Sequence, residues 1–224
     1  MHRKMVLKIH VVAGFAIVLS GLAGCGVTYL AQAAHGQLSV MNARQPIDKV
    51  IAQPATSDKL RTQLQQVKRI RDFASKELGL PDNASYRSYA DIERPYVVWN
   101  VVAAPQLSVE PRQWCFPVAG CVAYRGYFNE EGARKFAEKL QKQGDDVVVG
   151  GVSTYSTLGR VADPILSTVN GYGELDLAGL IFHELAHQQL YIPSESSFNE
   201  AFAVTVEDAG VARYAQSLGD AAAL

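Results

Sequence analysis

The chain has 224 residues, of which 48% are hydrophobic and 19% are charged, and this composition is typical of a globular protein. It excludes a disordered chain and an extended repeat array. The 21 basic and 22 acidic residues leave a formal net charge of −1. Nucleic-acid phosphates require a positive surface, so we expect no nucleic-acid partner.

The N-terminal residues 1–24 are predicted to be a signal peptide. The first ten residues carry Arg3, Lys4 and Lys8, and residues 11–22 are largely apolar. A positive segment followed by a short apolar one is the layout of a secretory signal. The apolar part is shorter than the ~20 residues that cross a bilayer. An uncleaved anchor helix is the alternative.

The apolar segment ends in Leu22-Ala23-Gly24-Cys25, which resembles the lipobox of bacterial lipoproteins. That resemblance implies cleavage before Cys25 and attachment of lipid to its thiol. Several acyl chains anchor a protein firmly, because each buried CH2 contributes ~0.8 kcal/mol. Gly26 stands where an Asp would act as an inner-membrane retention signal. By the same analogy we expect a cell-envelope protein, anchored in the outer membrane and facing the periplasm.

Two helices are predicted in the first part of the mature chain. Residues 27–50 are apolar-rich and predict a helix in which Gly36 is the weak point. Beyond Pro54, residues 57–78 carry apolar side chains at helical spacing, and Gly79 ends the pattern. The recurring positions predict a face packed into the core; they are Leu60, Leu64, Val67, Ile70 and Phe73.

A small sheet is predicted in the middle of the chain. Residues 96–103 are rich in β-branched and aromatic side chains and predict a strand. A strand over 118–128, crossed by a cysteine loop, leads into a helix over 129–143 that is capped by its first residue, and a strand over 146–152 follows. These three segments predict a strand–helix–strand unit, and residues 153–173 predict a loop.

The two remaining cysteines, Cys115 and Cys121, flank a segment in which Pro117 and Gly120 can turn the chain back. An oxidising periplasm favours a disulfide between them, and closing so small a loop contributes roughly 2 kcal/mol in the chain-entropy model. Two free buried thiols are the alternative. A zinc site is disfavoured, because no second Cys pair or nearby His completes four ligands.

The strongest signal is His183-Glu184-Leu185-Ala186-His187, inside the first of two C-terminal helices predicted over 174–190 and 197–218. Positions four apart share a helix face, so two imidazoles can reach one Zn²⁺ at ~2.0–2.1 Å. Glu184 lies ~100° round the helix from His183. There it can act as general base toward a water whose pKa zinc lowers toward ~7. Two metal-free histidines are the alternative.

The third metal ligand must be found outside this motif, since a catalytic zinc takes three protein ligands and keeps one open position. No His or Cys follows His187, so a carboxylate is required unless distant His35 supplies the ligand. Glu200 is favoured, because a short turn would fold the next helix back and bring it to the histidines. The acidic candidates are Glu195, Glu200, Glu207, Asp208 and Asp220.

This arrangement resembles the gluzincin group, in which the third ligand is a Glu in an Asn-Glu-small pattern on the following helix. Asn199-Glu200-Ala201 matches that pattern. The spacing from His187 is shorter than in the best-known members, and by their spacing Glu207 is the ligand instead. Glu200 and Glu207 share a helix face, so the one that does not bind the metal can orient a ligand.

The chain resembles more closely a family of predicted bacterial aminopeptidases carried as lipoproteins. Members continue past the region that matches Glu207, whereas this chain stops at Leu224, so we expect a peptidase domain that is incomplete at its C-terminus. The resemblance implies removal of an N-terminal residue. The matching stretches are residues 24–25, 32–38, 114–121, 124–128, 163–168 and 183–207.

Tyr124, Arg125 and Tyr127 are candidate substrate-binding residues, because they lie on a strand that matches the family. Zincins typically lay an edge strand along the substrate, and such residues could also stabilise the oxyanion. A half-buried strand with a solvated Arg is an equal alternative.

The sequence therefore predicts an α+β, zincin-like fold, dominated by helices with a small mixed β-sheet. We expect a signal peptide (1–24), a lipid-anchored helical segment (25–56) and a peptidase domain (57–224). The expected function is a zinc-dependent peptidase, an aminopeptidase, with one Zn²⁺ per chain, a peptide substrate and a lipid bilayer partner through Cys25. The alternative is a non-catalytic envelope lipoprotein with a structural or vestigial zinc site.

Overall fold

The computed structural model describes residues 26–116 and 120–219. The predicted signal peptide and Cys25 lie outside these residues. A compact unit begins at Val40, and helix α2 (Gly26–Asn42) belongs mostly to a separate unit, so it is considered by itself. Among the described residues, no helix combines the length and the apolar character that crossing a membrane requires.

The predicted single helix over residues 27–50 is wrong, because the chain leaves the helical conformation before Pro46. Helix α2 ends at Asn42, strand β1 covers Arg44–Pro46, and helix α3 covers Ile47–Ala52. Proline lacks an N–H and disfavours helical backbone at the preceding residue. Pro46 is itself extended and forms the N-cap of α3.

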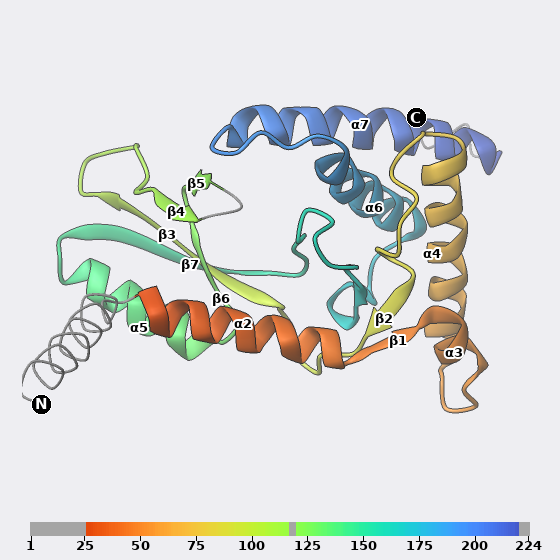
Figure 1. The fold of residues 1–224 in the computed structure, drawn as a ribbon, viewed down its shortest axis with the longest axis horizontal. Helices are drawn as coiled ribbons and strands as arrows, with labels where there is room; N and C mark the ends of the chain where they lie inside the picture. The colour runs from red at the N-terminus through yellow and green to blue at the C-terminus, as the bar shows by residue number, and fades with distance from the viewer. Residues whose placement is uncertain (1–25, 117–119, 220–224) are drawn as a thin grey trace, which may run out of the picture. The chain divides into compact units, whose positions relative to one another are not determined.

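Three helices build the main hydrophobic core: α4 (Asp58–Lys76), α6 (Glu174–Gln189) and α7 (Ser196–Ser217). Helix α6 packs against both of the others (Figure 1). All three agree with the predicted helices within two residues. The Ser57 hydroxyl caps α4 by accepting a hydrogen bond from Leu60 N. The fully buried residues of this core include Leu64, Val67 and Ile70 from α4 and Leu177, Ile181, Phe182 and Leu185 from α6.

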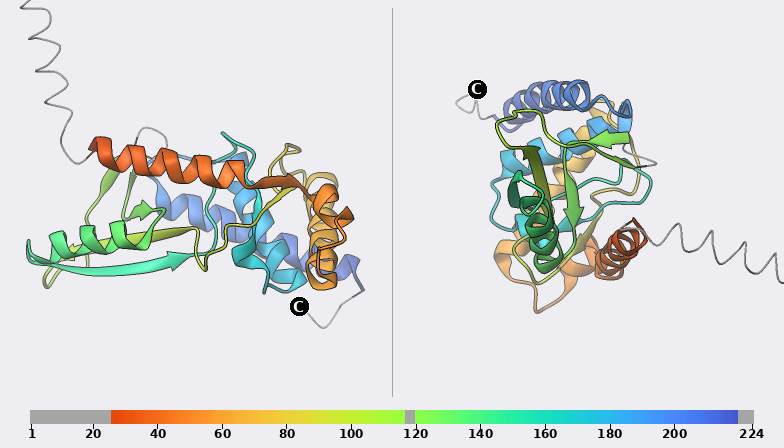
Figure 2. Two further views of the ribbon diagram at one scale, coloured as in Figure 1. Left: turned by 90° about the horizontal axis from the view of Figure 1, so that it is seen from below. Right: turned by 90° about the vertical axis from the view of Figure 1, so that its left-hand side faces the viewer.

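A three-stranded sheet has β3 (Val98–Pro105) at its centre, between β6 (Arg125–Tyr127) and β7 (Asp145–Val152). Both neighbours run antiparallel to β3. Helix α5 (Glu130–Gln141) connects β6 to β7 and covers one face of the sheet (Figure 2). Its N-cap is Asn129, whose side chain accepts from Gly132 N. The predicted strand–helix–strand unit is therefore present, with β3 lying between its two strands.

The predicted continuous strand over 118–128 is wrong. The chain instead forms a hairpin of β4 (Trp114–Phe116) and β5 (Gly120–Val122), and β6 follows as a separate strand. Gly120 takes a φ of +73°, in the left-handed region that glycine tolerates, so the backbone bends where the sequence predicts extension.

A second three-stranded sheet joins distant parts of the chain. Strand β2 (Ser88–Ala90) pairs antiparallel with β1 and parallel with β8 (Ile165–Leu166). Strand β8 and the short 3₁₀ helix η1 (Ser167–Val169) lie inside the predicted loop 153–173 and lead into α6. Strands of two or three residues are too short to show a hydrophobic period.

The fold is mixed α+β, about half helical with small sheets, which agrees with the predicted class at that level. The domain boundaries at residues 25 and 57 stay predictions.

Candidate metal site

The two motif histidines lie on the side of α6 that faces α7. The opposite side of α6 is held in the core by fully buried Leu185. His187 is buried and His183 is half-buried, with exposed side-chain fractions of 7% and 19%. Because the rest of α6 is fixed by packing, the two imidazoles have little freedom to move apart.

Three ligand atoms converge between α6 and α7. The two Nε2 atoms of His183 and His187 are 3.1 Å apart. The Glu200 carboxylate lies 3.4 Å from His183 Nε2 through Oε2 and 3.6 Å from His187 Nε2 through Oε1. Donors at ~2.05 Å around one tetrahedral ion lie ~3.3 Å from each other. These side chains therefore form a triad that can hold a metal ion.

The second ring nitrogen of His183, Nδ1, is hydrogen bonded to Glu207. His183 Nδ1 lies 2.9 Å from Glu207 Oε2. When Nδ1–H donates to this carboxylate, the lone pair of Nε2 is left for a metal, which is the usual arrangement of a metal-binding histidine. The structure thus brings Glu200 to the two Nε2 atoms and Glu207 to Nδ1 of His183.

The protonation state of His187 also suits a metal ligand. Burial lowers the pKa of His187 below its ordinary value, against the opposing attraction of Glu200. A neutral imidazole is the form that binds metals. Within the described residues, the buried His187 Nδ1 has no hydrogen-bond partner, so its orientation comes from packing and from what Nε2 binds.

A tight turn between α6 and α7 sets the position of Glu200. The Asn199 side chain accepts from Ile192 N and donates to Ile192 O, both at 2.8 Å, and only 1% of Asn199 is exposed. This pair of hydrogen bonds closes the turn before α7, and Glu200 follows Asn199 directly, near the start of the helix. The Asn of the Asn-Glu-Ala pattern therefore has a structural role next to the ligand.

Gly179 makes room for the Glu207 side chain, a role that the sequence analysis did not predict. It lies one turn before His183, and a Cβ added there would be 2.9 Å from Glu207 Oε1. Gly210 on α7 lies similarly close to Phe182, because a Cβ added at Gly210 would be 2.8 Å from the Phe182 ring. A glycine within a helix costs about 1 kcal/mol relative to alanine, so each of the two was a detectable sign of close packing.

Glu184 follows His183 on α6 and is partly buried. Burial raises its pKa to about 7, and the neighbouring His183 opposes this shift. The charge of Asp163 raises the pKa further, and Ser156 opposes the increase. Asp163 is itself buried and accepts hydrogen bonds from Thr157 N at 3.0 Å and Thr157 Oγ1 at 3.1 Å. The loop before β8 thus forms the polar surroundings of Glu184.

The strand that carries the candidate substrate-binding residues packs on α5. The Arg125 guanidinium lies 4.5 Å from the ring centroid of Phe136 on α5, and Tyr127 packs on the same ring at 5.7 Å. A role for Arg125 and Tyr127 in substrate binding stays a prediction. Tyr124 is exposed, and its part in substrate binding stays a prediction.

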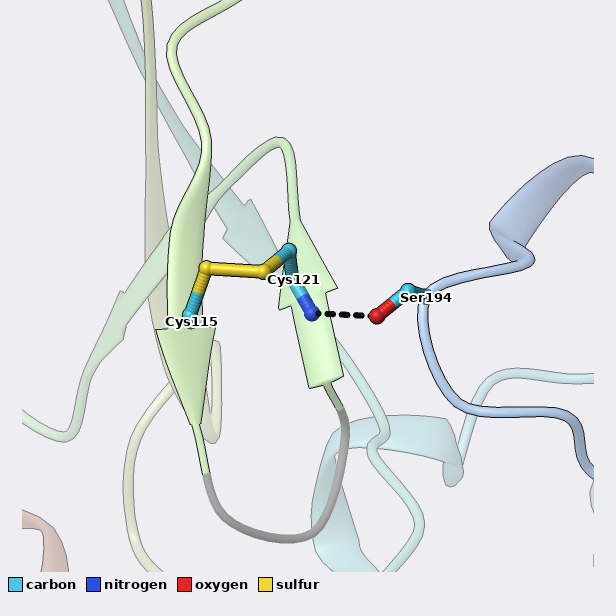
Figure 3. The surroundings of a disulfide bond; sticks show 3 residues. All are labelled: Cys115, Cys121 and Ser194. Atoms are coloured by element: carbon cyan, nitrogen blue, oxygen red, sulfur yellow. Dashed lines mark hydrogen bonds between the residues drawn. A yellow bond between two sulfur atoms is a disulfide. The ribbon is translucent and has the colours of Figure 1, made fainter.

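The structure joins Cys115 and Cys121 in a disulfide with an S–S distance of 2.01 Å. The two residues face each other across β4 and β5. Figure 3 shows that this hairpin contacts the turn after α6, where Cys121 N donates to Ser194 Oγ at 3.1 Å.

Comparison with known proteins gives one family match. The model of the family described as "Putative aminopeptidase" matches residues 28–224, which includes every residue of the triad. No curated protein and no solved structure matches the chain.

Proposed function

This chain belongs to the putative aminopeptidase family, and on that premise we propose that it is a zinc-dependent peptidase that removes residues from the N-termini of peptides. The observation that carries the proposal is the convergence of two imidazole nitrogens and one carboxylate at separations of 3.1 to 3.6 Å. Two histidines and a glutamate are a ligand set typical of catalytic zinc.

The open side of the triad is where chemistry would occur. The Glu200 side chain is 63% exposed, whereas both histidines are covered, so water and substrate approach from the Glu200 side. Zinc, when bound, supplies a Lewis acid that polarises a carbonyl and lowers the pKa of a water toward ~7.

Glu184 is proposed as the general acid and base. Its carboxyl group is buried and interacts electrostatically with His183 and Glu200, and a carboxylate at such a position can accept a proton from a water and return it. In the proposed reaction Glu184 takes the proton of the attacking water and passes it to the leaving amine. Asp163 anchors the adjoining loop by accepting hydrogen bonds from Ser156 and Thr157.

The proposed location is the cell envelope, with a lipidated Cys25 in the outer membrane. The lipobox-like residues 22–25 support it, as does the disulfide between Cys115 and Cys121, a bond favoured by oxidising compartments. Lipid mass on the isolated protein, and its loss in Cys25→Ala together with membrane partitioning, tests this part.

The enzymatic proposal is tested by zinc content and by amino-acid release from a peptide panel. Glu184→Gln should keep one zinc per chain and lose activity by about 100-fold or more. Glu110→Gln, at an exposed position on the loop after β3, is the matched control and should remain active. If wild type and Glu184→Gln both bind zinc and release nothing, the protein is not a peptidase, and a structural zinc site takes its place.

A further inference from the structure

The disulfide hairpin of β4 and β5, called here the cysteine hairpin (residues 114–116 and 120–122), lies directly on the turn that follows α6. A Cβ at Gly120 would be 2.5 Å from Ser194 Oγ and 2.6 Å from Ser194 N. The next residue, Cys121, donates its N–H to Ser194 Oγ at 3.1 Å (Figure 3). Only glycine permits so close an approach of the two backbones.

Ser194 needs such support. Its φ of +70° is in the left-handed region, which residues other than glycine adopt at a cost and keep only when their surroundings impose it. On the other side of the turn, Asn199 bonds both backbone groups of Ile192. The turn is therefore held from two sides, by α7 itself and by the cysteine hairpin.

Glu200 has little else to fix it. Within the described part of the chain, its ion-pair partners are the two histidines of the proposed metal site, and most of its side chain is in solvent. Its position before metal binding thus follows from the backbone of the turn that precedes it.

We propose that the cysteine hairpin is a positioning element of the metal site: through Ser194 it holds the α6–α7 turn in the conformation that presents Glu200 to His183 and His187. This inference rests on the proposed metal-dependent function. The disulfide keeps β4 and β5 in register, so that Gly120 and the Cys121 N–H stay against Ser194. The hairpin acts through Glu200 and does not touch the metal.

The first test measures the zinc dissociation constant of the metal-free protein by competition with a chromophoric chelator. Cys115→Ser combined with Cys121→Ser, Gly120→Ala, and Ser194→Ala should each weaken zinc binding about tenfold, the lower range for residues that orient a ligand. Ser197→Ala, an exposed serine on the same segment, is the matched control and should bind as wild type does. Equal affinities throughout overturn the proposal.

The second test locates the effect at Glu200 by a double-mutant cycle. In a Glu200→Ala background, Gly120→Ala and Ser194→Ala should cause no further loss of zinc affinity, because the ligand that they position is gone. A tenfold loss that persists in this background shows that the hairpin acts on stability in general and overturns the proposal. These two variants also carry the test if the cysteine double variant does not fold.

A third measurement separates this inference from the proposed function. Hydrogen–deuterium exchange of residues 192–200 in the metal-free protein should be faster in Gly120→Ala and Ser194→Ala than in Ser197→Ala. Unchanged exchange overturns the positioning role. A wild-type protein that binds no zinc but shows the faster exchange in the variants removes the peptidase proposal and leaves the hairpin's hold on the turn intact.

Discussion

Replacing Gly179 by alanine should stabilise the metal-free protein and weaken its metal site. The new Cβ would be 2.9 Å from Glu207 Oε1 and 3.5 Å from its Cγ, so the flexible end of Glu207 must move. Helix propensity favours alanine by about 1 kcal/mol. The shifted carboxylate loses its 2.9 Å contact with His183 Nδ1, and losing such an orienting partner costs 10–100-fold in metal affinity.

The assay pairs thermal unfolding of the metal-free protein with zinc affinity measured by chelator competition. We expect a higher melting temperature together with binding that is about tenfold weaker. In a Glu207→Ala background, Gly179→Ala should leave the affinity unchanged, since no carboxylate remains to be displaced. The reasoning is refuted if Gly179→Ala weakens binding equally in both backgrounds, or leaves it unaltered in the wild-type background.

Three further predictions follow from the same structure. Glu200→Ala should weaken zinc binding by more than about 100-fold, beyond the range for a residue that only orients a ligand, whereas Glu207→Ala should stay within that range; the reverse order in zinc titration would make Glu207 the ligand. Burial raises the pKa of Asp163, so the folded state holds a proton that the unfolded chain has released. The free energy of unfolding should therefore fall as pH rises from the pKa of Asp in the unfolded chain through the higher pKa of Asp163 in the folded state. The decrease should be about 1.4 kcal/mol for each pH unit between the two pKa values. Asp163→Asn should abolish that part of the slope in urea unfolding, and an unchanged slope contradicts the assignment. Arg71 is fully buried and donates to three backbone carbonyls of residues 81–85. Arg71→Ala should cost about 3 kcal/mol or more in the same assay, and a loss below about 1 kcal/mol would show that solvent replaces these bonds.

The long helices and the histidine pair could be predicted from the sequence. Residues 57–78 carry apolar side chains at helical spacing from Leu60 to Phe73, so local signals agree with the tertiary packing. His183 and His187 are four positions apart, which fixes their relation on any helix. The sequence could rank Glu200 above Glu207 as the candidate ligand but could not place either carboxylate, because the two lie on the same helix face and only the turn before α7 brings Glu200 to the two Nε2 atoms.

The short strands and the hairpin contacts could not be predicted. Strand β2 pairs with residues 44–46 and with residues 165–166, so its existence depends on partners far away in the chain. Pro46 is present in the sequence as a residue that interrupts helices, yet the apolar content of residues 27–50 favoured one continuous helix. Gly120 and Ser194 meet only because two elements approach in the folded state, and no local pattern encodes such an encounter.

All three ligands of the triad lie on one antiparallel helix pair, and this has a consequence for the lifetime of the protein. Helix α7 buries mainly small or polar side chains: Asn199, Ala203, Gly210, Tyr214 and Ala215. A metal ion shared between α6 and α7 adds its binding free energy to the attachment of α7, and this contribution scales with the free-metal concentration. When metal is scarce, α7 would detach more readily and become accessible to proteases, so the supply of the ion would control how much of the protein persists.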